Sequence, residues 1–139
     1  MNSRVLGQGH PDTLTSMSNL AATYSNQGRW VEAEGLEVLV METRKRVLGQ
    51  EYPSTLAIMA KLATTYRNQG RWNEAEGLLL QVMEARKRVL GQGHQDTLNS
   101  MGNLAATFWS QGRWNEVERL LLQVMETRKR MLGRELPDT

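Results

Sequence analysis

The sequence contains no cysteine, only two histidines, three prolines and one phenylalanine among its 139 residues. Without cysteine the chain has no disulfide framework, no thiolate nucleophile and no cysteine-bound zinc. Two histidines make a histidine metal site or a histidine-based catalytic triad hard to build. We therefore expect no metal, no cofactor and no enzymatic activity.

Long apolar runs are missing as well, and no stretch approaches the roughly 18 apolar residues of a membrane span. The first residues lack the apolar segment of a secretory signal, and the chain has no Asn-x-Ser/Thr glycosylation site. The composition is 40% hydrophobic with a net charge of +2, which is typical of a soluble globular domain. These features predict a cytoplasmic protein that does not contact membranes.

What the sequence does contain is a repeat with a period of 42 residues. Any two of its three copies share 27 to 30 identical residues, and the copies span residues 4–45, 46–87 and 88–129. We predict a single domain over residues 1–139, with residues 130–139 as the start of a truncated fourth repeat. The chain is interpreted as a segment of a longer array or an assembly of consensus-like units.

The second copy shows how each repeat begins with a helix. Between Leu56 and Tyr66 the larger apolar residues recur every three or four positions, which marks one face of an α-helix. Pro53 precedes this stretch and suits a first helical turn. Gly70 follows it and favours a helix stop. The pattern predicts a first helix over residues 54–69.

A second helix is predicted after Trp72. Asn73 is positioned to cap it, and Glu76 lies three residues further on, which is the spacing of a capping box. Val31 replaces the asparagine in the first copy, so we expect that helix to lack a side-chain cap. Gly91 is expected to end the second helix. A pair of such helices has too little core to stand alone, so the copies should stack into a solenoid.

The helix pairs resemble the tetratricopeptide repeat. Each copy carries Leu-Ala-x-x-aromatic in its first helix and a small residue nine positions after the aromatic one, at Ala33, Ala75 and Val117. The tryptophan of each Gln-Gly-Arg-Trp motif and the 42-residue period resemble the kinesin-light-chain class of these repeats. The near-identical copies are similar to the C-terminal arrays of fungal and bacterial NACHT or NB-ARC receptor proteins. The resemblance implies an all-α, right-handed superhelical solenoid that binds other proteins.

The resemblance also implies a concave groove lined by the first helix of each repeat. Kinesin-light-chain repeats carry an asparagine before Leu-Ala that bonds to a peptide backbone; Asn19 and Asn103 match it, whereas Lys61 departs from it. An asparagine suits this role because it donates and accepts hydrogen bonds. The expected groove residues lie off the core face of the first helices: Asn19, Ser25, Asn26, Lys61, Arg67, Asn68, Asn103 and Trp109. The alternative is that they are solvated polar positions of the repeat.

We therefore expect a non-enzymatic scaffold that binds an extended or helical peptide segment of a partner protein. The charges of Lys61 and Arg67 would favour an acidic stretch. The alternative function is a self-associating array, either domain-swapped or end-to-end, because terminal helix faces such as those of Leu14 and Leu121 would lack a neighbouring repeat.

Two other features are interpreted structurally. The Arg-Lys-Arg run at residues 44–46 recurs in each copy and could bind phosphates. Cations are also favoured at the C-terminal end of a helix by the helix dipole, so the run has a structural explanation. Nucleic-acid binding is therefore not expected. His10 and His94 share a repeat position with Tyr52, which predicts a packing role near the helix start.

Overall fold

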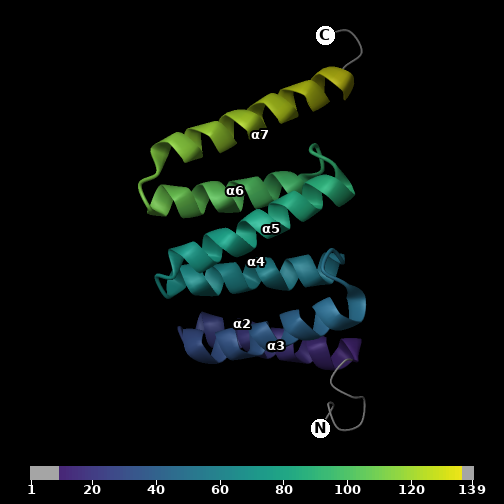
Figure 1. The fold of residues 1–139 in the computed structure, drawn as a ribbon, viewed down its shortest axis with the longest axis vertical. Coiled ribbons are helices and arrows are strands. Elements are labelled where there is room, and N and C mark those ends of the chain that lie inside the picture. Colours follow the sequence, from purple (N-terminus) through teal and green to yellow (C-terminus); the bar gives the residue numbers. More distant parts are fainter. Residues whose placement is uncertain (1–9, 136–139) are drawn as a thin grey trace. The chain divides into compact units, whose positions relative to one another are not determined.

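The computed structural model describes residues 10–135, and within them it contains six α-helices and no strand (Figure 1). The helices are α2 (Pro11–Asn26), α3 (Trp30–Leu48), α4 (Pro53–Asn68), α5 (Trp72–Leu90), α6 (Gln95–Ser110) and α7 (Trp114–Glu135). Each copy of the repeat supplies two helices joined by a short turn. The all-α class and the three helical hairpins predicted from the sequence are therefore confirmed.

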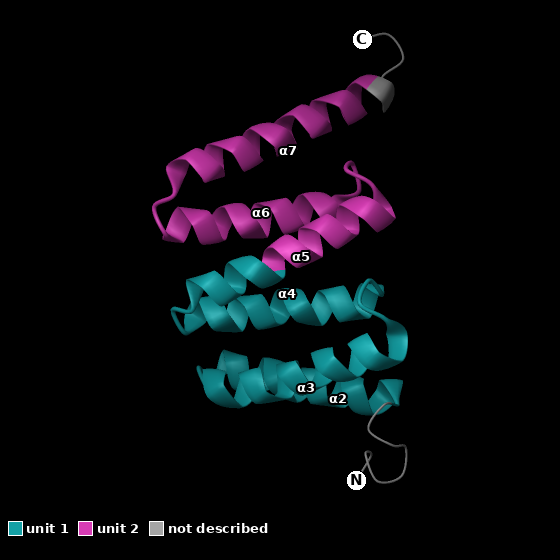
Figure 2. Ribbon diagram, viewed as in Figure 1, with its two compact units in different colours: residues 1–78 teal, residues 79–139 magenta. Residues whose placement is uncertain are grey.

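The chain divides into two compact units, residues 1–78 and residues 79–139, with the boundary inside α5 (Figure 2). In the first unit α3 packs against both α2 and α4. In the second unit α6 packs against α7.

The first helix of the second copy starts one residue before the predicted residue 54, and the sequence analysis did not predict how the first helices are capped. Pro53 is the first residue of α4. In α2 and α6 the preceding histidine caps the helix: the Nδ1 atom of His10 accepts the backbone N–H of Asp12 at 3.1 Å, and that of His94 accepts the N–H of Asp96 at 3.0 Å. The expected packing role is wrong for these histidines, because an imidazole nitrogen can accept the N–H groups left free at a helix start. Tyr52 makes no such side-chain bond.

The second helices begin two residues earlier than the predicted cap position implies. The helix α5 starts at Trp72, so Asn73 lies inside it and the predicted asparagine cap is wrong. The residue before the tryptophan takes the cap position instead, and it is an arginine whose side chain pairs with a glutamate three residues ahead. The Arg71–Glu74 pair spans 3.1 Å and the Arg29–Glu32 pair 3.2 Å.

The turn between the two helices of a pair explains this start. Gly28, Gly70 and Gly112 adopt positive φ angles of 74°, 80° and 73°, a conformation that favours glycine and stops the first helix. After Gly70 the chain reverses, and the N–H of Arg71 donates to the carbonyl of Tyr66 at 2.8 Å. The helix stop predicted at Gly70 is therefore confirmed.

The same arginine covers the aromatic ring of the first helix. The guanidinium carbon of Arg71 lies 4.1 Å from the centre of the Tyr66 ring, within the range of a cation–π contact. The first and third copies repeat the contact at 4.3 Å, with Arg29 over Tyr24 and Arg113 over Phe108. Arg71 also pairs with Glu34 of α3 at 2.8 Å, which ties this turn to the preceding helix pair.

Burial of the first helices depends on their neighbours. Leu62 of α4 is 1% exposed, whereas Leu20, at the same repeat position in α2, is 44% exposed. The difference arises because α4 packs against α3, while within the described residues no helix precedes α2. Leu14 of α2 is buried, so its expected exposure at this end is wrong. At the other end Leu121 of α7 is 48% exposed, as expected.

One buried position differs in polarity between copies. Ile58 of α4 and Ser100 of α6 occupy it, and both side chains are fully buried. The Ser100 hydroxyl accepts a hydrogen bond from Arg86 Nη1 at 2.8 Å. The equivalent Arg44 donates to the carbonyl of Ser54 at 3.1 Å, and burial lowers the pKa of its guanidinium.

Replacing Tyr52 by aspartate should supply the cap that α4 lacks. We expect Tyr52→Asp to raise the free energy of unfolding by about 0.5–1 kcal/mol, whereas Tyr52→Ala should not. His94→Ala should lower it by about 1 kcal/mol, because an existing cap is lost. Urea denaturation followed by circular dichroism measures all three. Equal stability of the aspartate and alanine variants would contradict the assignment.

The ring of Tyr66, rather than its hydroxyl, should stabilise the turn, because the third copy has phenylalanine there. Tyr66→Ala is expected to cost about 3 kcal/mol of unfolding free energy, as large aromatic truncations do. Tyr66→Phe is the matched control and should cost less than about 1 kcal/mol. A Phe variant as unstable as the Ala variant would show that the hydroxyl is the essential group.

Candidate functional site

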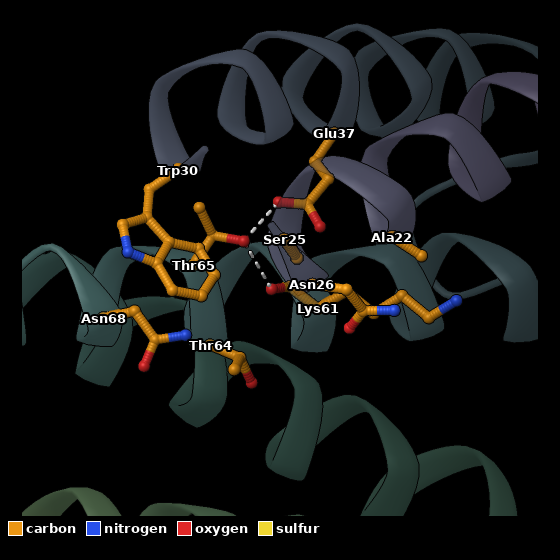
Figure 3. A pocket seen from close by; sticks show the side chains of 9 residues that line it. All are labelled: Ala22, Ser25, Asn26, Trp30, Glu37, Lys61, Thr64, Thr65 and Asn68. Carbon is orange, nitrogen blue, oxygen red and sulfur yellow. Dashed lines mark hydrogen bonds between the residues drawn. The ribbon is translucent and has the colours of Figure 1, made fainter. Parts of the chain in front are cut away.

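A pocket of about 350 Å³ opens in the first compact unit (Figure 3). The helices α2 and α4 form its sides, and two residues of α3 complete it. Its lining residues are Ala22, Ser25, Asn26, Trp30, Glu37, Lys61, Thr64, Thr65 and Asn68.

Helix geometry brings these residues together. In α4, Lys61, Thr64 and Thr65, and Asn68 follow one another at spacings of three and four, so they lie on one face. In α2, Ala22 and Ser25 are related in the same way. Trp30 and Glu37 lie seven residues apart, which places them on one face of α3, two turns from each other. The packing of α3 against α2 and α4 brings the three faces to one pocket.

Glu37 is the unusual member of this set. It is 3% exposed, although it carries a carboxyl group. Thr65 Oγ1 donates a hydrogen bond to Glu37 Oε1 at 2.6 Å, and the same hydroxyl lies 3.3 Å from the carbonyl oxygen of Lys61. Among the described residues, no donor reaches the second carboxyl oxygen of Glu37.

Burial raises the pKa of Glu37 above the ordinary glutamate value. The hydrogen bond from Thr65 and the charge of Lys61 act in the opposite direction, and the charge of Glu34 adds to the increase. Desolvation is the largest of these effects, so the neutral form of the carboxyl is favoured relative to a glutamate in water.

Four of the eight residues expected in the groove line this pocket: Ser25, Asn26, Lys61 and Asn68. Asn19 of α2 and Arg67 of α4 lie in the same unit but outside it. Asn103 and Trp109 belong to the second unit and are exposed; the Trp109 ring meets Trp114 edge-on, with ring centres 4.9 Å apart. A role for these eight residues in binding stays a prediction.

Sequence reasoning missed Trp30, Glu37 and Thr65. A signal for Glu37 was present, because the two equivalent positions hold Leu79 and Leu121. Leu79 is as deeply buried as Glu37, so the first copy carries a carboxyl group where the second copy has a core leucine.

Two further features are absent from residues 10–135, which the structure describes. No three histidine, aspartate or glutamate side chains gather there in an arrangement that could hold a metal ion. In the same range, no helix combines the length and apolar character needed to cross a membrane.

Comparison with known families decides the identity of the repeat. The tetratricopeptide repeat family matches residues 12–88 and again residues 54–130. The chain belongs to the tetratricopeptide repeat family. Repeats of this family generally mediate protein–protein interactions and generally serve as scaffolds rather than enzymes. None of the curated protein sequences matches the chain.

Solved structures support the same fold. Two crystal structures of TPR-like repeats, from a Podosopora anserina protein named after kinesin light chain, superpose with a TM-score of 0.84 at 31% identity. They cover 94% and 95% of this chain, which spans 62% and 63% of theirs. BtubC (BKLC) from P. vanneervenii matches with a TM-score of 0.83 at 18% identity, over 95% of this chain and 53% of its own.

The chain is thus similar in structure to TPR-like repeats of a protein named after kinesin light chain. The chain spans less than two thirds of the length of each of these proteins. They give no link to NACHT or NB-ARC receptors, so that part of the resemblance stays a prediction.

Replacing Glu37 by leucine, the residue of the other two copies, should stabilise the protein. At about pH 7 we expect Glu37→Leu to raise the free energy of unfolding by roughly 1 kcal/mol or more, because a desolvated charge is removed. A carboxyl with a raised folded-state pKa binds more protons in the folded than in the unfolded state. The wild-type protein should therefore lose stability, relative to the variant, as pH rises above about 4.

Urea denaturation of both proteins between about pH 4 and pH 8 measures this difference. The exposed Glu42→Leu variant is the control and should change stability by less than about 0.5 kcal/mol at pH 7. A wild-type–variant difference that does not grow with pH would contradict the buried position of Glu37.

Proposed function

We propose that the chain binds an extended or helical peptide segment of a partner protein, with the pocket between α2 and α4 as one contact point. The observation that supports this best is the pocket itself, which gathers four of the predicted groove residues. Asn26 and Asn68 carry amides that can donate to and accept from a peptide backbone. Trp30 adds an aromatic surface of the kind that is enriched at binding hot spots.

The remaining predicted residues are proposed to bind the partner within their own units, with no catalytic role. Asn19 and Arg67 belong to the first unit, and Asn103 and Trp109 belong to the second. Lys61 is exposed and makes no ion pair within the described residues, so its ammonium group is available to a carboxylate of the partner. We therefore propose that the bound segment carries an acidic residue beside the pocket. A cytoplasmic location is proposed from the cysteine-free sequence.

Peptide selection followed by mutation tests this function. We select peptides from a random display library on the wild-type chain. These peptides should bind the Asn26→Ala/Asn68→Ala variant about tenfold more weakly, because the variant lacks both side-chain amides. Fluorescence polarisation measures the affinities. The double variant should keep its stability within about 0.5 kcal/mol per site, since both residues are exposed.

Asn73→Ala is the matched control, because Asn73 is an exposed asparagine that does not line the pocket. It should leave peptide affinity unchanged. If the selected peptides bind the double variant as tightly as the wild type, the pocket is not the binding site.

A second candidate function is end-to-end self-association, and a specific observation favours it. Met125 of α7 is 48% exposed, whereas Met41, at the same repeat position in α3, is buried. Leu20 of α2 is likewise exposed where Leu62 of α4 is buried against α3. We propose that α7 of one copy can pack on α2 of a second copy in the way that α3 packs on α4. Such a head-to-tail contact does not close, so it would give chains of increasing length.

Light scattering over a wide range of protein concentration tests self-association. The wild-type mass should rise with concentration. Leu20→Lys and Met125→Lys should each hold the protein at the monomer mass, because each places a charge in the contact. Val31→Lys, at another exposed apolar residue, should not. A monomer at every concentration would reject this candidate function.

A further inference from the structure

The pocket contains one buried negative group, and nothing in the fold of the repeat requires it. The two equivalent positions hold leucines, and Leu79 fills its place as an ordinary core residue. Glu37 uses one carboxyl oxygen for the 2.6 Å bond with Thr65. Its second oxygen has no donor among the described residues. A side chain that is 97% buried, lines a pocket and has an unused acceptor is suited to a ligand that supplies a positive donor.

The other walls of the pocket suit the same kind of ligand. Trp30 presents an indole to the same pocket, two helical turns along α3 from Glu37, and an aromatic ring can contact an ammonium or guanidinium group. Ser25, Asn26 and Asn68 add side-chain oxygens that can accept hydrogen bonds. The pocket thus combines a counter-ion, an aromatic surface and several neutral acceptors.

We propose that this pocket receives the cationic side chain of an arginine or lysine of the bound peptide, with Glu37 as its counter-ion. The inference rests on the proposed peptide-binding function and names one residue of the ligand. Together with the acidic residue proposed to meet Lys61, it describes a segment in which a basic residue enters the pocket and an acidic residue lies beside it.

The charges around Glu37 are consistent with this assignment. Lys61 of α4 is the one cation among the lining residues, and its side chain is exposed. Water and salt weaken the field of an exposed charge more than that of a buried one. Glu34, which lies in α3 together with Glu37, adds a second negative charge nearby. The Glu34 carboxylate forms an ion pair with Arg71. The α2 residues that line the pocket carry no charge.

Other ligand side chains fit less well. A carboxylate in the pocket would meet the Glu37 carboxyl and be repelled or forced to share a proton. An aliphatic side chain could fill the space, but it would leave the second oxygen of Glu37 without a donor.

Binding of a cation should be linked to ionisation of Glu37. Because burial raises the pKa of Glu37, its carboxyl group in the free protein holds a proton more readily than that of a glutamate in water. A bound cation favours the ionised form, so binding should release a proton. The affinity for a cationic ligand should therefore increase with pH until Glu37 is fully ionised.

The experiment uses single-residue probes and the full chain. N-acetyl-arginine N-methylamide is titrated into isotope-labelled protein at about pH 7, and the indole N–H signal of Trp30 is followed by nuclear magnetic resonance. N-acetyl-leucine and N-acetyl-glutamate N-methylamides are the matched neutral and acidic probes. We expect the arginine probe to bind saturably and roughly tenfold more tightly than either of the others.

Variants identify the group responsible. Glu37→Leu restores the residue of the other copies, so it should fold, and it should weaken arginine-probe binding about tenfold. Glu37→Gln keeps the shape and removes the charge, and it should abolish the pH dependence of binding. Glu42→Gln, an exposed carboxylate away from the pocket, is the control and should change neither property.

Two results would overturn the inference: equal binding of the arginine probe by wild type and Glu37→Leu, or tighter binding of the glutamate probe. The failure of the proposed function is recognised separately. If library peptides without a basic residue bind the wild type and lose affinity in Asn26→Ala/Asn68→Ala, the groove function stands and the assignment of a cationic ligand is wrong.

Discussion

The structure depends on one constraint, which is that a pair of helices of this length cannot bury its apolar face by itself. Leu62 of α4 is buried because α3 lies against it, and Leu20 of α2 stays exposed because it has no such neighbour among the described residues. Stability in such an array comes from contacts between neighbours, so each helix needs a partner on two sides. At the other end of the described residues, Leu121 and Met125 of α7 are exposed for the same reason.

The candidate site is a product of this stacking. The helices α2 and α4 both pack against α3, and residues of all three helices line one common pocket. The arginine of each turn supports the arrangement, because it covers the ring of its own repeat and Arg71 also reaches Glu34 of the preceding one. Most of the pocket residues lie on exposed faces of these helices, whereas Glu37 and Thr65 are buried and belong both to the packed core and to the pocket lining.

Much of the fold could be predicted because the spacing of apolar residues indicates a helix and a glycine after it indicates where the helix ends. The stretch from Leu56 to Tyr66 indicated α4, and Gly70 indicated its end. The helix caps were harder to predict, because they depend on the conformation of the turn. Gly70 adopts a positive φ angle, α5 then starts at Trp72, and Asn73 lies within the helix. Half of the expected groove residues share the pocket because helix faces are predictable. The replacement of Leu79 and Leu121 by Glu37 was visible in the sequence, but only the packing of α3 against α2 and α4 shows that its carboxyl group lines a pocket.

The mismatch between Ile58 and Ser100 bears on how such a gene can change length. The copies agree at most other buried positions of the first helix, including Leu56 and Leu98, so α3 would meet nearly the same surface on α6 as it meets on α4. Loss of one 42-residue unit by recombination between copies would therefore leave the junction intact. At that new junction Arg44 would face the serine hydroxyl that Arg86 already bonds, in place of an isoleucine. The first helices α4 and α6 would therefore offer α3 surfaces that differ at one of the buried positions of α4.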